Sequence, residues 1–186
     1  MENPQEALKQ AIEQLPIEGK DSDKIKESLE SLASKIFEKG MTPREAMGMS
    51  KEMVEGLYGF GYRLYNTGKY PQASQLFRLL ILIDPTEPRY TLGLAACFHM
   101  QKDYENAAAA YMLCSLISPN DPMLFYHASD CYMQMNKPHL AVEALENALK
   151  KMKGREEFTA LRDRASLTLE MAKQKEKLAK QNETAA

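Results

Sequence analysis

Three alanines, Ala73, Ala107 and Ala141, stand 34 residues apart, and the same order of large, small and aromatic residues recurs around each of them. A repeat of this length is typical of paired helices that stack on one another along the chain. Each unit of such a stack buries its apolar face only against its neighbours. The period therefore predicts an array of helices for the central part of the chain.

Several aligned positions hold residues of similar size in all three units. Two registers of large residues and one of small residues stand out, namely Leu64, Phe98 and Tyr132, then Phe77, Tyr111 and Leu145, and then Gly61, Ala95 and Ser129. Two antiparallel helices approach closely where both carry small side chains, and large apolar residues fill the space beside them. These registers predict a regular helical hairpin in every unit.

Prolines and turn residues mark the ends of the predicted helices. Pro122 fits the first position of a helix, because its missing N–H would have no partner there, and Asp121 can cap the same end. Gly68 fits the position just past the end of the first helix in the first unit. A helical hairpin of 34 residues with these boundaries is the tetratricopeptide repeat.

We therefore predict an all-α fold, in which three tandem tetratricopeptide repeats form an α-solenoid between N-terminal helices and a C-terminal capping helix. The predicted segments are a mobile stretch at 1–20, N-terminal helices at 21–53, repeats at about 54–87, 88–121 and 122–153, a capping helix at 154–175 and a polar tail at 176–186. The apolar residues of the capping helix fall on one face, and they are Phe158, Leu161, Ala165, Leu169 and Ala172.

The N-terminal helices carry one amphipathic stripe, formed by Ile25, Leu29, Leu32 and Ile36. This stripe can pack onto the first repeat within one chain, or it can form the interface of a homodimer, and both interpretations stay open. Residues 42–45 read as a capping box, which starts the next helix. We expect that helix to reach Ser50 or to continue into the first repeat.

Composition agrees with one soluble domain of 186 residues. The net charge of −2 gives no electrostatic reason to bind nucleic acid, and no apolar run is long enough for membrane insertion. No signal peptide is recognised, and a reducing cytoplasm is the expected compartment. Cys97, Cys114 and Cys131 are interpreted as small core thiols, with redox or metal roles as the weaker alternative.

We expect no enzyme, no cofactor and no metal site. The three histidines, His99, His127 and His139, lack the paired spacing of metal ligands, and no two cysteines form a CxxC motif. The chain also has neither a nucleophile turn nor a glycine loop that could hold phosphate.

The first helix of every repeat lines the concave side of such a stack, and its outward positions are the candidate site. The peptide-binding candidates are Tyr58, Tyr62, Tyr65, Arg89, Leu92, His99, Tyr126, His127, Asp130 and Met133. They are mostly aromatic or apolar, and tyrosine combines a large apolar ring with a hydroxyl that can bond to an extended backbone. This pattern predicts a peptide groove, and the alternative is that single tyrosines are partly buried between helices.

Three segments carry a family resemblance, and they read LYGFGYRLYNTGKY at 57–70, LGLAAC at 92–97 and YHASDC at 126–131. In order and spacing they resemble the class II chaperones of bacterial type III secretion, the CesD/SycD/LcrH family. The resemblance covers residues from about 42 to 172. It departs from the family at Ser129 and Asp130, where many members have alanine and glutamate, and in an extended N-terminus.

The resemblance implies a chaperone of the bacterial cytoplasm that holds two hydrophobic translocator proteins before export. It implies that the groove takes an extended translocator segment and that the N-terminal helices often form a homodimer. Carried over by position, the implied groove residues are Tyr58, Tyr62, Tyr65, Leu92, Tyr126, His127 and Asp130.

Two alternative functions remain open. A tetratricopeptide adaptor for acidic C-terminal tails needs lysine and asparagine where this chain has Tyr58, Tyr62, Met123 and His127, so that carboxylate clamp is absent. The other alternative is a chaperone that also binds a transcriptional activator, and the sequence does not decide it.

Overall fold

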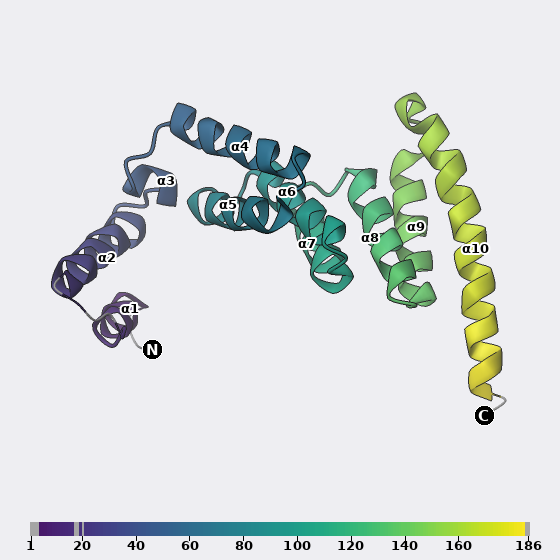
Figure 1. Cartoon of the computed structure of the whole chain (residues 1–186), viewed down its shortest axis with the longest axis horizontal. Helices are drawn as coiled ribbons and strands as arrows, with labels where there is room; N and C mark the ends of the chain where they lie inside the picture. The colour runs from purple at the N-terminus through teal and green to yellow at the C-terminus, as the bar shows by residue number, and fades with distance from the viewer. Residues whose placement is uncertain (1–3, 17–18, 20, 185–186) are drawn as a thin grey trace. The chain divides into compact units, whose positions relative to one another are not determined.

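The computed structural model describes residues 4–16, 19 and 21–184. Within them the regular structure is helical throughout (Figure 1). The elements are α1 (Pro4–Glu13), α2 (Ser22–Phe37), α3 (Pro43–Ala46), α4 (Lys51–Asn66), α5 (Tyr70–Ile83), α6 (Pro88–Met100), α7 (Tyr104–Ile117), α8 (Pro122–Gln134), α9 (Pro138–Met152), the 3-10 helix η1 (Glu156–Phe158) and α10 (Thr159–Thr184).

The chain forms two compact units. The first comprises Met1–Leu57 and Leu82–Asp84, and the second comprises Tyr58–Ile81 and Pro85–Ala186. In the second unit each helix packs on the next from α6 to α10, as expected when every hairpin buries its apolar face against its neighbours (Figure 1).

Local residues start and end these helices as their chemistry requires. The carboxylate of Asp121 accepts a hydrogen bond of 2.9 Å from the Met123 backbone N–H and so caps α8, as predicted. The turns inside the three hairpins place Gly68, Lys102 and Asn136 in the left-handed region, with φ of 77°, 61° and 55°. These residues are again 34 positions apart, so the repeat extends to backbone conformation.

The N-terminal unit differs from the prediction in one place. The capping box at α3 is present, because the Thr42 hydroxyl accepts from the Glu45 N–H while the Glu45 carboxylate accepts from the Thr42 N–H. The expectation that this helix reaches or passes Ser50 is wrong, since α3 ends at Ala46. Gly48 has a φ of 66°, which breaks the helix, and the Ser50 hydroxyl then accepts from the Met53 N–H at the start of α4.

The stretch predicted as a mobile segment at 1–20 contains α1. This helix packs on α2, and its Ile12 is 7% exposed. Residues 1–3, 17–18 and 20 lie outside the described residues. Mobility of the segment stays a prediction.

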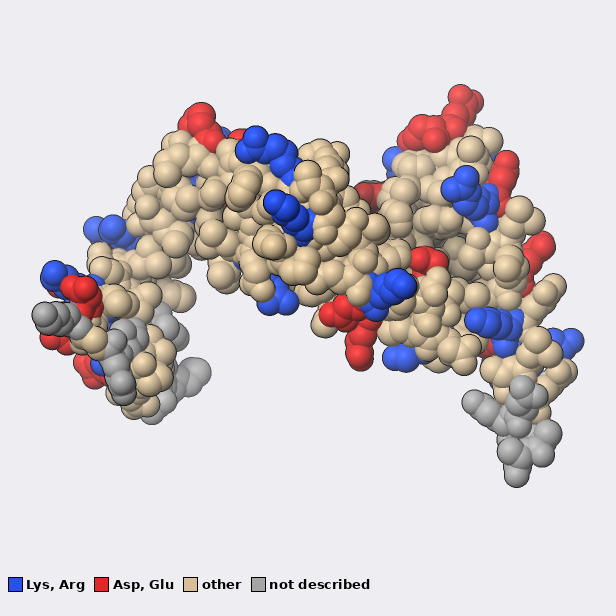
Figure 2. All heavy atoms as spheres, viewed as in Figure 1, with Lys and Arg blue, Asp and Glu red and all other residues tan. Residues whose placement is uncertain are grey.

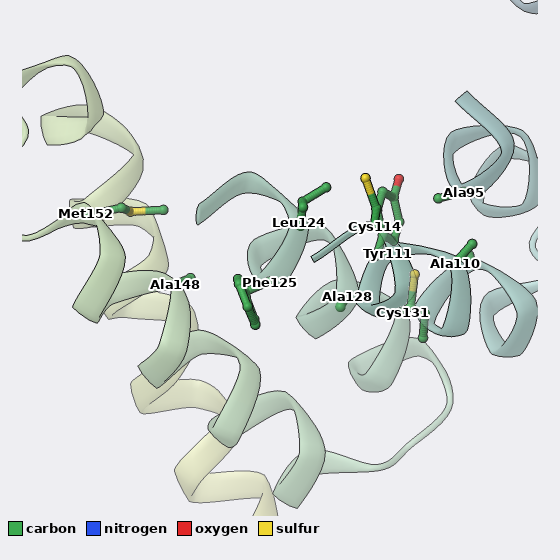
Figure 3. Close-up of a cluster of buried hydrophobic side chains, with 12 residues drawn as sticks. Ala95, Ala110, Tyr111, Cys114, Leu124, Phe125, Ala128, Cys131, Ala148 and Met152 are labelled. Atoms are coloured by element: carbon green, nitrogen blue, oxygen red, sulfur yellow. The ribbon is translucent and has the colours of Figure 1, made fainter. Parts of the chain in front are cut away.

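Small residues form the core of the second unit. In the cluster between α6 and α9, Ala95, Ala128 and Ala148 are fully buried beside larger side chains such as Tyr111 and Phe125 (Figure 3). Close helix packing needs small residues at such crossings, as the aligned registers predicted.

The three cysteines are free and buried, which agrees with the prediction of core thiols. Burial raises the pKa of Cys97 and Cys114 to about 11 and that of Cys131 to about 12. Thiols of this kind stay protonated at neutral pH and behave as small apolar groups.

The C-terminal helix packs through its predicted face but is longer than predicted. Ala165 and Ala172 are fully buried and lie in one cluster with Leu145 of α9. The helix continues past the predicted end at residue 175 to Thr184, so the segment predicted as a polar tail is helical over 176–184. An ion pair of 2.6 Å between Lys180 and Glu176, one turn apart, supports this extension.

No described helix is long and apolar enough to cross a membrane. Lysine and arginine side chains alternate with aspartate and glutamate over the visible surface, without a large field of one sign (Figure 2).

The ring of Phe77 in α5 lies close to glycines of α4 and α6. Phe77 is 2% exposed, and a Cβ atom placed on Gly61 of α4 would lie 3.4 Å from its ring. A Cβ atom on Gly93 of α6 would lie only 2.6 Å from the same ring. Because the ring is enclosed, it cannot move aside freely, and Gly93 is required by packing.

Gly93→Ala is therefore expected to lower the free energy of unfolding by about 1–3 kcal/mol through overpacking against Phe77. Gly59→Ala is the matched control, because a Cβ atom there meets nothing within 4 Å and alanine favours the helix by up to about 1 kcal/mol. Urea denaturation followed by circular dichroism measures both. Equal stability of the two variants would contradict the packing argument.

Candidate peptide-binding site

All ten predicted site residues lie on the first helices of the repeats, within the second unit. Tyr58, Tyr62 and Tyr65 are on α4, Arg89, Leu92 and His99 on α6, and Tyr126, His127, Asp130 and Met133 on α8. None of them is buried, and Tyr62 is 54% exposed. Partial burial between helices, the alternative for single tyrosines, does occur at Tyr58, Tyr65 and Tyr126, whereas Tyr62 is exposed. We call these ten residues the aromatic face.

One part of the aromatic face is a tyrosine–arginine group, formed by Tyr58, Tyr62, Arg89 and the buried Tyr90. The rings of Tyr58 and Tyr62 are stacked with centroids 6.5 Å apart, and the Arg89 guanidinium lies 4.7 Å over the Tyr58 ring. Tyr58 also meets the Phe77 ring edge-on at 6.2 Å and lies 5.7 Å from Tyr90. The core thus fixes Tyr58, while Tyr62 presents its ring to solvent.

A second part is a histidine–aspartate group, formed by His99, Tyr111, His127 and Asp130. His99 Nε2 lies 2.9 Å from Asp130 Oδ2, and the Tyr111 hydroxyl lies 3.5 Å from His99 Nδ1. The His127 ring stacks on Tyr111 with centroids 5.4 Å apart. This group joins α6, α7 and α8 through polar contacts.

The partners indicate how the protons are placed in this group. Burial raises the pKa of Tyr111, so its hydroxyl stays protonated and can donate to His99 Nδ1. A neutral His99 then carries its proton on Nε2 and donates it to Asp130. The buried tyrosine in this way sets the tautomer of a histidine on the surface.

The remaining face residues are held more by packing. Tyr65 meets Tyr70 of α5 edge-on with centroids 5.4 Å apart, and burial raises its pKa. Tyr126 and Met133 pack partly against the cluster that α9 and α10 share. Leu92 is 36% exposed and follows Arg89 by one turn on α6.

The roles of Tyr111 and Gly93 in supporting this site were not predicted from the sequence. The repeat places Tyr111 in a register of large packing residues, which is correct for its ring. Its hydroxyl could have indicated a polar contact, because a buried tyrosine hydroxyl usually has a hydrogen-bond partner. Gly93 falls outside the register of small residues, so only the structure reveals its contact with Phe77.

The side chains of the aromatic face favour the binding of a peptide. It offers aromatic rings, tyrosine hydroxyls, a guanidinium and a carboxylate. Among the residues that the structure describes, no three or more His, Cys, Asp or Glu side chains are grouped to hold a metal ion. Large rings beside a few polar groups suit an extended peptide, whose apolar side chains and backbone both need partners.

Comparison with known proteins places the chain in a family. The tetratricopeptide repeat family matches residues 54–86, 90–120 and 124–150. The chaperone protein SicA of Salmonella typhimurium is 30% identical over 149 residues, which cover 78% of this chain and 88% of SicA. The Yersinia enterocolitica type III secretion translocator chaperone SycD, in complex with a peptide of the translocator YopD, matches with a TM-score of 0.65 at 30% identity, over 68% of this chain and 97% of SycD.

The chain belongs to the class II translocator chaperones of type III secretion. PcrH in complex with the chaperone binding region of PopD matches this translocator chaperone with a TM-score of 0.66 at 30% identity, over 69% of this chain and 97% of PcrH. SycD is also known in an alternative dimer. The family and the all-α tetratricopeptide fold predicted from the sequence are confirmed.

In this translocator chaperone, His127 is expected to make stability depend on pH. Burial, followed by the charge of His99, lowers the pKa of His127 below its usual value of 6.5. In the unfolded chain His127 takes up a proton near pH 6.5, whereas in the folded chain it does so only at a lower pH. The free energy of unfolding therefore falls as the pH drops below 6.5.

His127→Phe keeps a ring against Tyr111 but cannot titrate, while His99 and His139 remain as in the wild type. Urea denaturation at pH 7 and pH 5 should show a smaller loss of stability in His127→Phe than in the wild type. Parallel losses in the two proteins would exclude His127 as the titrating group.

Proposed function

We propose that this chain is a chaperone of the bacterial cytoplasm that binds an extended segment of hydrophobic type III translocator proteins and keeps them soluble and competent for export. The observation that carries the proposal is the aromatic face, whose ten residues are exposed or only partly buried on the first helices of three repeats. Membership in the family supports it, because SycD and PcrH were each solved with a translocator segment bound. The function is binding without a catalytic step.

The physical need for such a chaperone lies in the client. A translocator carries apolar surface intended for a membrane, and such surface promotes aggregation while it is exposed to water. Each apolar anchor that becomes fully buried on the aromatic face contributes about 1.5–3 kcal/mol, offset by the ordering of the peptide. A few anchors therefore suffice for binding that is specific and still reversible.

Tyr62 is the residue through which this proposal is tested most cleanly. Tyr62 is 54% exposed and its ring stacks on that of Tyr58, whereas Tyr65 is partly buried against Tyr70. Replacing Tyr65 would disturb packing, while replacing Tyr62 removes mainly accessible surface. Phe60 is the matched control, because it is 48% exposed on the same helix but lies about 200° around the axis from Tyr62.

Tyr62→Ala is expected to weaken binding of an extended peptide with spaced apolar and proline anchors by about 5- to 30-fold, as for an interface hot spot. The free energy of unfolding should change by no more than about 1 kcal/mol, the worth of the stacked pair with Tyr58. Phe60→Ala should leave affinity unchanged. Calorimetric titration of all three proteins measures this.

The same titration includes a peptide with an acidic C-terminal tail. Binding of this peptide alone would contradict the translocator function and favour a generic tetratricopeptide adaptor. Equal weakening by Tyr62→Ala and Phe60→Ala would place the binding site off the aromatic face.

We further propose that the stripe of Ile25, Leu29, Leu32 and Ile36 forms a homodimer interface. No residue of α2 is buried, although α1 and α3 pack on it, and Ile25 is 44% exposed. Ile25, Leu29 and Leu32 line a surface hollow together with Met47. Apolar surface in such a hollow is stabilised when a partner covers it.

The double variant Leu29→Asp and Leu32→Asp is expected to turn a dimer into a folded monomer, because two carboxylates cannot be buried unpaired in an interface. Light scattering gives the mass and circular dichroism the helicity. Ser31→Asp, on the exposed side of α2, is the control and should remain dimeric. A monomeric wild type, or a double variant that keeps the dimer mass, would contradict this interface.

A further inference from the structure

The Asp130 carboxylate is a fixed negative group on an otherwise aromatic part of the face. Its side chain is 48% exposed, and His99 holds Oδ2 at 2.9 Å. Among the described residues, His99 is the only basic side chain within 4.0 Å of this carboxylate. His99 in turn contacts the hydroxyl of the buried Tyr111, so the orientation of Asp130 depends on a core residue.

Aromatic rings flank this carboxylate. Tyr126 precedes Asp130 by four residues and His127 precedes it by three, and both spacings place side chains next to each other on a helix. The Tyr126 and His127 rings lie 5.8 Å apart. A cation that reaches a carboxylate beside rings can meet a ring face as well.

The tyrosine–arginine group shows how a cation can bind to a carboxylate and an aromatic ring at the same time. There the Arg89 Nε lies 3.0 Å from Glu87 Oε1, and the same guanidinium lies 4.7 Å over the Tyr58 ring. Carboxylate, cation and aromatic ring occur together at that end of α6. At Asp130 the carboxylate and the rings are present, and within the described part of the chain no lysine or arginine pairs with it.

We propose that Asp130 is a specificity residue that binds a basic side chain, preferably arginine, of the client segment. A guanidinium can bond to the carboxylate through Oδ1 while its plane stacks on Tyr126, and arginine suits this double contact better than lysine. The inference rests on the proposed function, and it adds a charged residue to the apolar anchors of the client. A client segment without a basic residue at that position loses this contact.

The test uses synthetic extended peptides with spaced apolar and proline anchors, each with one arginine placed at a different position. Every peptide has a partner in which neutral citrulline replaces the arginine. Fluorescence anisotropy measures binding to the wild type, to Asp130→Asn and to Asp163→Asn. The amide introduced by Asp130→Asn keeps an oxygen for His99, and Asp163→Asn removes one negative charge from an exposed site on α10.

For one position of the arginine, the wild type is expected to bind the arginine peptide about tenfold more tightly than its citrulline partner. In Asp130→Asn this ratio should fall below about threefold, and in Asp163→Asn it should persist. An equal loss of affinity for both peptides in Asp130→Asn would mean that Asp130 contacts the peptide backbone or only positions His99, and it would overturn the inference. An arginine preference that is absent, or unchanged in Asp130→Asn, would overturn it as well.

The outcomes separate this inference from the proposed function. Citrulline peptides that bind the wild type and lose affinity in Tyr62→Ala uphold the chaperone function even if arginine brings no gain. Failure of the wild type to bind any peptide of the set would contradict both.

Discussion

The contact of the Phe77 ring with Gly61 and Gly93 is the packing constraint on which the aromatic face depends. The helices that carry these glycines can approach the ring because neither glycine has a Cβ atom, and a Cβ atom on Gly93 would lie 2.6 Å from the ring. The same ring meets Tyr58 edge-on. A core contact thus fixes the first aromatic residue of the face, and the exposed Tyr62 is positioned by stacking on it.

The face combines two kinds of support. Around Tyr58 the support is apolar and comes from the core, whereas around Asp130 it is a chain of hydrogen bonds that runs from the buried Tyr111 through His99. Rigid rings lose little entropy when they bind a peptide, and a carboxylate held in place discriminates between charged and neutral partners. Affinity and specificity can therefore arise on different parts of one surface.

The period of 34 residues was sufficient to predict the paired helices and the repeats, because packing between equal units imposes equal spacing. The period was not sufficient to predict helix ends and contacts that depend on single residues. Gly48 ends α3 through a left-handed conformation, and α10 continues beyond the predicted end, where Glu176 and Lys180 form an ion pair. The bond from Tyr111 to His99 joins two helices and leaves no periodic signal.

The most direct test of where a client binds is a map of amide chemical shifts in the full chain during titration with an extended peptide that carries apolar and proline anchors. The account predicts that shifts concentrate on α4, α6 and α8, including Tyr62, Leu92 and Met133, while the exposed Leu79 of α5 and Leu113 of α7 do not change. Shifts centred on Leu79 and Leu113, with the aromatic face unaffected, would contradict it.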